Sequence, residues 1–251
     1  METLTLDIIL ILSLLAAVAG FVDAIAGGGG LIALPALLWA GLSPTQALAT
    51  NKLQGSFGTM MASWHFIRNG MVDIRSMVPE ILLTFIGAVS GTLLVQQLNS
   101  AFLADIIPIL LILIAIYTLL SPRMTDDKAK QRMSRRLFAL SIGFGVGFYD
   151  GFFGPGTGSF FTIGFVALMG LGLRDATAHS KILNFTSNIA AVIFFAVGGH
   201  MVWLLGLSMG LAQMGGAWLG AHIVIHKGSG IIKPLLVVVS ISMAVKLLIA
   251  D

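Results

Sequence analysis

The chain has 251 residues, of which 57% are hydrophobic and 10% are charged, and its formal net charge is +3. Ordinary soluble domains carry about 25% charged residues, so this composition excludes a soluble globular domain, a disordered chain and a coiled coil. The absence of cysteine excludes disulfides, thiol catalysis and cysteine-based metal sites. The positive charge does not indicate nucleic acid, because six of the 14 basic residues lie in one central loop, where they indicate membrane topology.

Apolar runs of membrane-spanning length follow one another along the chain. A spanning helix needs about 20 mostly apolar residues, and period-two alternation, which a membrane β-barrel needs, is absent. In the first half the apolar segments are 6–26, 31–40, 45–67, 77–97 and 102–120. In the second half they are 137–153, 160–171, 175–197, 201–225 and 231–249. We therefore predict an all-α polytopic membrane protein with four to five helical segments in each half.

The two halves match each other in sequence. Gly20–Asp23 parallels Gly147–Asp150 at an offset of 127 residues. Beyond the glycine clusters the offset becomes 129, and Lys52 then matches Lys181. Internal duplication of this kind is typical of secondary transporters. We predict an N-terminal transmembrane repeat (1–120), a basic cytoplasmic linker (121–136) and a C-terminal transmembrane repeat (137–251).

The second segment of each half, 31–40 or 160–171, is too short to span a membrane, since ten helical residues rise only about 15 Å. Gly27–Gly30 precedes the first of them, and Gly154–Gly158, with Pro155, precedes the second. Glycine and proline interrupt helices. We therefore predict broken or re-entrant helices at these motifs, buried in protein or lining a cavity.

Basic loops set the expected orientation. The loop 121–136 and the turn 68–75 should be cytoplasmic by the positive-inside rule. In the second half the turn 198–201 has no Lys or Arg, whereas the turn near Lys227 and Lys233 has two. This pattern favours inverted-topology repeats, with parallel repeats as the alternative.

Four charged residues lie within or beside apolar segments: Asp23, Lys52, Asp150 and Lys181. Each costs about 2.5–3.5 kcal/mol at the centre of a spanning helix, so we expect them to face the protein interior and to have partners. One interpretation is a polar pocket at the interface of the two halves. The alternatives are structural Asp–Lys contacts or snorkelling at helix ends.

Small polar side chains surround the two lysines: Thr50, Asn51, Ser180 and Asn184. On a helix, Lys181, Asn184 and Asn188 share one face. Amide and hydroxyl donors beside an ammonium suit an oxyanion, and we expect the backbone amides of Gly28, Gly29 and Gly156 to add further donors. The alternative is that these side chains only bond neighbouring helices. The paired GxxxG motifs are interpreted as packing seams.

Two classes of function fit a membrane protein with these features, a transporter and an intramembrane enzyme. Duplication, broken helices and internal lysines favour a transporter of small anions. Two aspartates on separate helices also fit an intramembrane protease, but such a dyad shares one proton, and here each aspartate has a lysine candidate that would keep it ionised. We therefore expect no enzyme, and no catalytic residue, cofactor or metal site.

Several motifs together resemble the TauE/SafE family of membrane permeases, also called the sulfite exporter family. They are GFVDAIAGGGGLIALP at Gly20–Pro35, ALATNKLQ at Ala47–Gln54, GFYDGFFGPGTGS at Gly147–Ser159 and ATAHSKILNFTSN at Ala176–Asn188. Within the family the chain looks closest to the bacterial branch of probable membrane transporters. The second half has Ser180-Lys181 where the first has Asn51-Lys52, so the two half-sites differ.

The resemblance implies ion-gradient-driven export of sulfite, sulfonates or related anions across a bacterial plasma (inner) membrane. We expect one anion between the halves, neutralised by Lys52 and Lys181, and moved by alternating access. Asp23 and Asp150 are candidates for carrying a coupling proton. A passive anion channel, or an importer of another small anion such as a carboxylate, is the alternative. The expected partners are the substrate, the lipid bilayer and a coupling proton or sodium ion, with a homodimer left open.

Overall fold

The computed structural model of this protein describes residues 5–120 and 126–227, and every regular element in these ranges is helical. The first half contains α1 (Leu6–Ala26), α2 (Gly29–Trp39), α3 (Pro44–Arg68), the 3-10 turn η1 (Ile74–Met77), α4 (Val78–Val95) and α5 (Ser100–Leu120). The second half contains α6 (Arg135–Phe138), η2 (Ala139–Gly143), α7 (Phe144–Phe152), α8 (Thr157–Met169), α9 (Leu173–Val197) and α10 (Trp203–Lys227).

These helices confirm the predicted helical fold class, and their bounds agree with the apolar segments to within a few residues. Within residues 5–120 and 126–227, three stretches are long and apolar enough to cross a membrane: Leu6–Ala26, Ile74–Val95 and Leu173–Val197. The last expected segment, 231–249, and part of the predicted linker, 121–125, lie outside the described residues. The division into repeats and linker stays a prediction.

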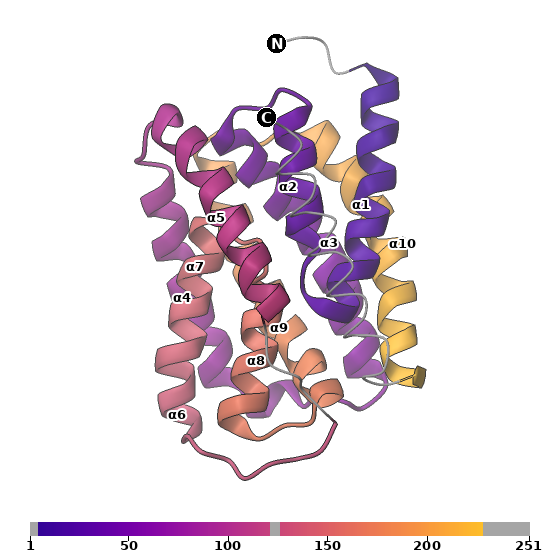
Figure 1. Cartoon of the computed structure of the whole chain (residues 1–251), viewed down its shortest axis with the longest axis vertical. Helices are drawn as coiled ribbons and strands as arrows, with labels where there is room; N and C mark the ends of the chain where they lie inside the picture. The colour runs from indigo at the N-terminus through magenta and orange to yellow at the C-terminus, as the bar shows by residue number, and fades with distance from the viewer. Residues whose placement is uncertain (1–4, 121–125, 228–251) are drawn as a thin grey trace.

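Both glycine motifs interrupt a helix, as the sequence predicts. α1 ends at Gly27, which has a φ of 79°, and α2 begins two residues later. Gly154 and Gly156, between α7 and α8, have φ angles of 105° and 84°. This left-handed region is open to glycine at little cost, whereas other residues are strained there. The short helices α2 and α8 therefore turn back beside α1 and α7, and α1 descends in Figure 1 whereas α6 and α7 ascend.

The helix from Arg135 to Phe152 is continuous but irregular. Its middle part, η2, is a π-helical turn between α6 and α7, and the residues at both junctions keep right-handed helical angles. η2 packs against α4. Such π-helical turns occur often at functional sites.

Two seams join helices from opposite halves of the chain. α4 packs on α7, and a Cβ at Gly87 would overlap the carbonyl oxygen of Phe144. α10 packs on α1 in the same way, and a Cβ at Gly216 would overlap the carbonyl oxygen of Ala17. These contacts agree with the interpretation of the GxxxG motifs as packing seams, because only glycine lets the backbones approach so closely.

The apolar interior forms two separate cores. The long helices contribute to both: the two ends of α3 supply Leu48 and Phe66, and those of α9 supply Phe195 and Leu173. α10 also contributes its first part to one core and its last part to the other. Polar side chains occupy the middle of each of these helices, so a polar layer lies between the two apolar cores.

Candidate functional site

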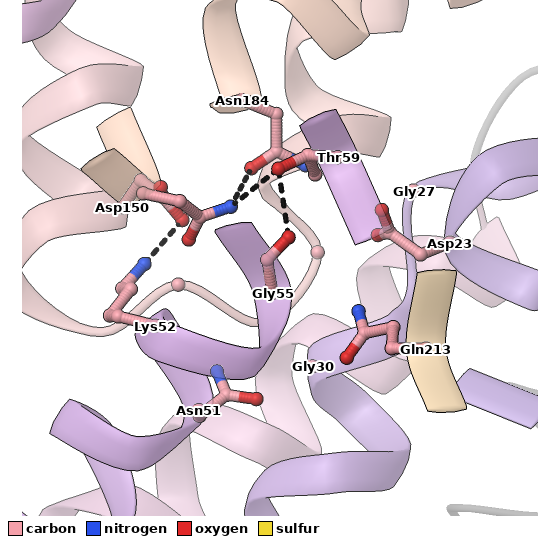
Figure 2. Close-up of a pocket in the computed structure, with 13 residues that line it drawn as sticks. Asp23, Gly27, Gly30, Asn51, Lys52, Gly55, Thr59, Asp150, Asn184 and Gln213 are labelled. Carbon is pink, nitrogen blue, oxygen red and sulfur yellow. Dashed lines mark hydrogen bonds and ion pairs between the residues drawn. The ribbon is translucent and has the colours of Figure 1, made fainter. Parts of the chain in front are cut away.

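A small cavity lies in this polar layer, at the middle of α3, α9 and α10. It is lined by Asp23, Gly27, Gly30, Asn51, Lys52, Gly55, Thr59, Asp150, Gly154, Gly156, Asn184, Asn188 and Gln213. The cavity has a volume of about 30 Å³, which is room for one or two water molecules. The cavity is therefore narrow, and its wall is made almost entirely of polar side chains and glycines (Figure 2).

Lys52 of α3 forms an ion pair with Asp150 of α7. The distance from Nζ to Oδ1 is 2.7 Å, and both side chains are 2% exposed. The same Oδ1 accepts a 2.6 Å hydrogen bond from the hydroxyl of Thr157, the first residue of α8. Gly154 makes room for the ammonium, since a Cβ there would lie 2.5 Å from Nζ. Asp150 thus links the end of α7, the start of α8 and α3.

Lys181 of α9 forms the matching pair with Asp23 of α1. Its Nζ donates to Oδ2 at 2.9 Å, and the other oxygen, Oδ1, accepts from the backbone N–H of Gly29 at 3.3 Å. Asp23 therefore binds the start of α2, as Asp150 binds the start of α8. In both pairs, the lysine and the aspartate come from opposite halves of the chain.

Four buried charges in one layer are held only because they compensate one another. Moving a charged group out of water costs several kcal/mol, and each ammonium here has a carboxylate in contact. Asp23 and Lys52 both line the same cavity, so the two pairs lie side by side. The formal charges of the two pairs cancel, and neither ammonium is free to bind an anion in this state.

The two glycine motifs meet beside the cavity. A Cβ at Gly27 would overlap the backbone of Gly158, and one at Gly158 would lie 3.0 Å from Nζ of Lys181. The Ser159 hydroxyl donates to the carbonyl oxygen of Ala26 at 2.7 Å. The tips of the two helical hairpins are thus in direct contact, backbone against backbone.

Two acceptor atoms on the cavity lining have no hydrogen-bond partner among the described residues: Oδ2 of Asp150 and Oε1 of Gln213. Gln213 reaches the cavity from α10 between two glycines, because a Cβ at Gly20 or Gly58 would meet its side chain. Buried acceptors are normally satisfied. Both oxygens can accept a hydrogen bond from a water molecule or from a donor group of a ligand, and the carboxylate oxygen of Asp150 can also bind a proton.

No group of three or more His, Asp or Glu residues in the described part of the chain lies close enough to hold a metal ion.

The family model described as "Sulfite exporter TauE/SafE" matches residues 12–247. The chain belongs to the TauE/SafE family. It is 47% identical to the probable membrane transporter protein YfcA of Escherichia coli (strain K12), over 95% of this chain and 88% of that protein. It is also 47% identical to the probable membrane transporter protein ORF9 of Sinorhizobium sp., over 99% of this chain and 95% of that protein. No solved structure matches the chain significantly.

A third relative is the probable membrane transporter protein of Haemophilus influenzae, 43% identical over 96% of this chain and 95% of that protein. Membership of the TauE/SafE family confirms the predicted resemblance. The family and the names of the relatives indicate a membrane transporter of the TauE/SafE type, and these relatives are named as transporters rather than as enzymes.

Most of the predicted site residues lie in the TauE/SafE motifs, and the fold brings them together around the cavity. Six of the candidates line the cavity: Asp23, Asn51, Lys52, Asp150, Gly156 and Asn184. Lys181 lies behind Asp23 and is fully buried. Asn51 accepts a hydrogen bond from Gln54, and Asn184 accepts one from Asn188. Their assignment to substrate binding stays a prediction.

Four other candidates lie beside the cavity without lining it: Thr50, Ser180, Gly28 and Gly29. The Thr50 hydroxyl accepts from the backbone N–H of Val202 at 3.4 Å. The Ser180 hydroxyl donates to the carbonyl oxygen of Thr177 and accepts from Thr162. These hydroxyls bond neighbouring parts of the fold, which is the alternative that the sequence left open.

Sequence reasoning missed Gln213, Thr59 and Gly55 as parts of the lining. A signal existed for Gln213, which is the one amide side chain in the apolar segment 201–225. Thr59 and Gly55 had no such signal, because small residues are common throughout membrane helices. Only their position one turn apart on α3, facing Asn188, places them in the site.

Proposed function

We propose that this protein is a multi-pass secondary transporter of a bacterial inner membrane, which exports small sulfur-containing anions such as sulfite and sulfonates. The single observation that carries the proposal is the pair of buried Lys–Asp contacts that cross between the two halves and flank a central polar cavity. A substrate anion binds there by replacing a carboxylate as the partner of an ammonium.

Alternating access between two inverted repeats supplies the movement. Three features support this arrangement: the matched seams α4–α7 and α1–α10, the two lysine pairs, and the opposite directions of α1 and α7 in Figure 1. Central sites between inverted repeats, built at broken helices, are a recurring design of secondary transporters. The joined hairpin tips at Gly27 and Gly158 provide the contact about which one half rocks against the other.

Proton binding and anion binding are linked at Asp150. Its Oδ2 is buried and has no hydrogen-bond partner among the described residues, and a proton bound there removes the negative charge that neutralises Lys52. The ammonium then has one uncompensated positive charge, which is costly in a buried site unless an anion replaces the carboxylate. Proton and anion therefore favour each other's binding. Asp23 has both oxygens bonded, so Asp150 is the better proton carrier of the two.

This linkage is compatible with export. A divalent anion that moves with one proton keeps one net negative charge, and a membrane potential that is negative inside drives that charge outward by about 2.3 kcal/mol per 100 mV. The driving force for export is thus the membrane potential, opposed in part by the proton gradient.

The test is anion flux in proteoliposomes that contain the purified full chain. Efflux of radiolabelled sulfite, thiosulfate, a sulfonate and a carboxylate identifies the substrate class. We expect Lys52→Ala and Lys181→Ala to abolish flux while the protein remains monodisperse in detergent. Lys128→Ala is the matched control, because that lysine also pairs with an aspartate, Asp175, but its side chain is 73% exposed.

Unchanged flux in both buried-lysine variants would contradict the proposal that Lys52 and Lys181 bind the anion. Counterflow separates carrier from channel: unlabelled anion on the far side accelerates the exchange of label through a carrier but not through a passive channel. Replacing the proton gradient by a sodium gradient distinguishes the two coupling ions.

A further inference from the structure

A third buried carboxylate lies outside the cavity, beside the first residue of α6, and α6 begins at the lower end of the molecule in Figure 1. Glu80 of α4 is 0% exposed, and its Oε1 is 3.1 Å from Nε of Arg135. Its Oε2 is buried and has no hydrogen-bond partner among the described residues. The Arg135 side chain is 44% exposed, so the carboxylate lies one side chain below the surface.

Among the described residues, the charged or titratable groups that interact with Glu80 come from two elements. α6 contributes Arg135, and α9 contributes His179, which interacts electrostatically with Glu80. α7 carries its ionisable side chains, Tyr149 and Asp150, deeper in the molecule. Glu80 is thus the outermost carboxylate of this seam.

α4 and α7 run in the same direction, so their residues can be matched along the seam. A Cβ at Gly143 would lie 3.4 Å from the carbonyl oxygen of Glu80, and one at Gly147 would lie 2.5 Å from that of Thr84. Asp150 is three residues beyond Gly147. By backbone position, Glu80, Thr84 and Asp150 therefore follow one another at intervals of about one helical turn, or about 5.4 Å.

Thr84 lies between the two carboxylates and is suited to pass a proton. Its Oγ1 is buried, and it has no hydrogen-bond partner among the described residues. A hydroxyl donates one hydrogen bond and accepts others. The Thr84 hydroxyl lies near Gly143, seven residues before Asp150 on the same helix, so the remaining distance of about 10 Å along the helix needs a chain of water molecules. The π-helical turn η2 lies alongside, and Gly143 within it leaves space near the Thr84 hydroxyl, where a Cβ would lie 3.5 Å from Oγ1.

The other seam lacks this series of oxygens. At the offset of 129 that matches the two GxxxG motifs, Met209 corresponds to Glu80 and Gln213 corresponds to Thr84. Met209 is fully buried in an apolar core, and a thioether does not exchange protons. Among the described residues, the α1–α10 seam therefore has no buried carboxylate at the position that corresponds to Glu80, and its outer acidic residue, Asp7 in the first turn of α1, is exposed.

We propose that Glu80 and Thr84 form a proton pathway from the α6 end of the molecule to Oδ2 of Asp150. A proton from water binds Glu80, and transfer through the Thr84 hydroxyl breaks one O–H bond for each that forms, until Asp150 is protonated and Glu80 is ionised again. This inference rests on the proposed function, because it supplies the proton that releases Lys52 for the anion.

The test compares two assays in the same proteoliposomes with radiolabelled sulfite. The first is uptake driven by an imposed pH gradient, with proton entry followed by a pH-sensitive dye. The second is exchange of labelled for unlabelled sulfite at equal pH, in which the proton stays on Asp150. For Glu80→Gln we expect gradient-driven uptake to fall by about tenfold or more, while exchange stays within about twofold of wild type, because the pathway is not used.

Thr84→Val should show the same split, and Thr84→Ser should restore gradient-driven uptake. Thr92→Val is the matched control on α4, because the Thr92 hydroxyl donates to the carbonyl oxygen of Gly151 and is already satisfied. This variant should keep both activities.

Arg135→Gln separates a proton role from a structural one. It removes the ion pair but leaves the carboxyl, so it should keep gradient-driven uptake. Equal loss of both activities in Glu80→Gln and Arg135→Gln, or full gradient-driven uptake in Glu80→Gln, would overturn the pathway. Absence of any sulfite exchange by the wild-type protein would instead contradict the proposed function itself.

Discussion

The ammonium of Lys52 and the carboxylate of Asp150 are 2.7 Å apart although their helices belong to opposite halves of the chain. Lys181 and Asp23 repeat this relationship at 2.9 Å. Each contact joins an uninterrupted helix, α3 or α9, to the end of a broken one. The pairs therefore both neutralise the buried charges and hold the two halves together around the cavity.

The first prediction concerns the stability that this ion pair provides. Removing one partner leaves an uncompensated buried charge, so Lys52→Met or Asp150→Asn alone should destabilise the protein by about 3–5 kcal/mol. The double variant removes both charges and should recover much of that loss. Thermal unfolding in detergent, followed by tryptophan fluorescence, measures the difference. A double variant as unstable as the sum of the two singles would contradict the pairing.

A second prediction concerns Gly154, which has a φ of 105° and lies against Nζ of Lys52. Gly154→Ala should abolish transport, because the methyl group displaces the ammonium from Asp150. Gly41→Ala is the matched control: its φ is 83°, but no described heavy atom lies within 4 Å of a Cβ there. Backbone strain of about 1–3 kcal/mol is common to both variants. If flux falls equally in both, strain rather than displacement of Lys52 is the cause.

The seam between α1 and α10 yields a third prediction from two neighbouring glycines. A Cβ at Gly216 overlaps the carbonyl oxygen of Ala17, whereas a Cβ at Gly215 meets no described atom within 4 Å. Gly216→Ala should therefore destabilise the protein by about 1–3 kcal/mol through overpacking. Gly215→Ala should be neutral or stabilising by up to about 1 kcal/mol through helix propensity. Melting temperatures that do not differ between the two would disprove the close approach of these helices.

A fourth prediction separates residues that line the cavity from those that only support it. Asn184 lines the cavity, whereas the Ser180 hydroxyl is fully engaged by Thr177 and Thr162. Asn184→Ala should raise the KM for the anion, since it removes a donor from the site. Ser180→Ala should leave KM unchanged and cost about 1 kcal/mol of stability. A raised KM in Ser180→Ala would contradict this distinction and indicate that Ser180 takes part in substrate binding.

The positions of the helices and their interruptions could be predicted because they depend on local sequence. The apolar run 6–26 is stable only in apolar surroundings, and the glycines at Gly27–Gly30 weaken helical structure enough for the helix to be interrupted there. The same local information identified the charged residues that needed partners. Their burial follows from the cost of an unpaired charge in an apolar layer.

The sequence by itself determined a helical membrane protein with broken helices, four internal charges and the TauE/SafE motifs. Only the tertiary structure decided that each lysine pairs with the aspartate of the other half, because pairing within a half is equally compatible with composition and spacing. It also brought Gln213 into the cavity and left oxygens of Glu80, Thr84 and Asp150 without a hydrogen-bond partner in the part of the chain that the structure describes. Such relations join residues far apart in the chain, and they arise from how helices pack rather than from any local pattern.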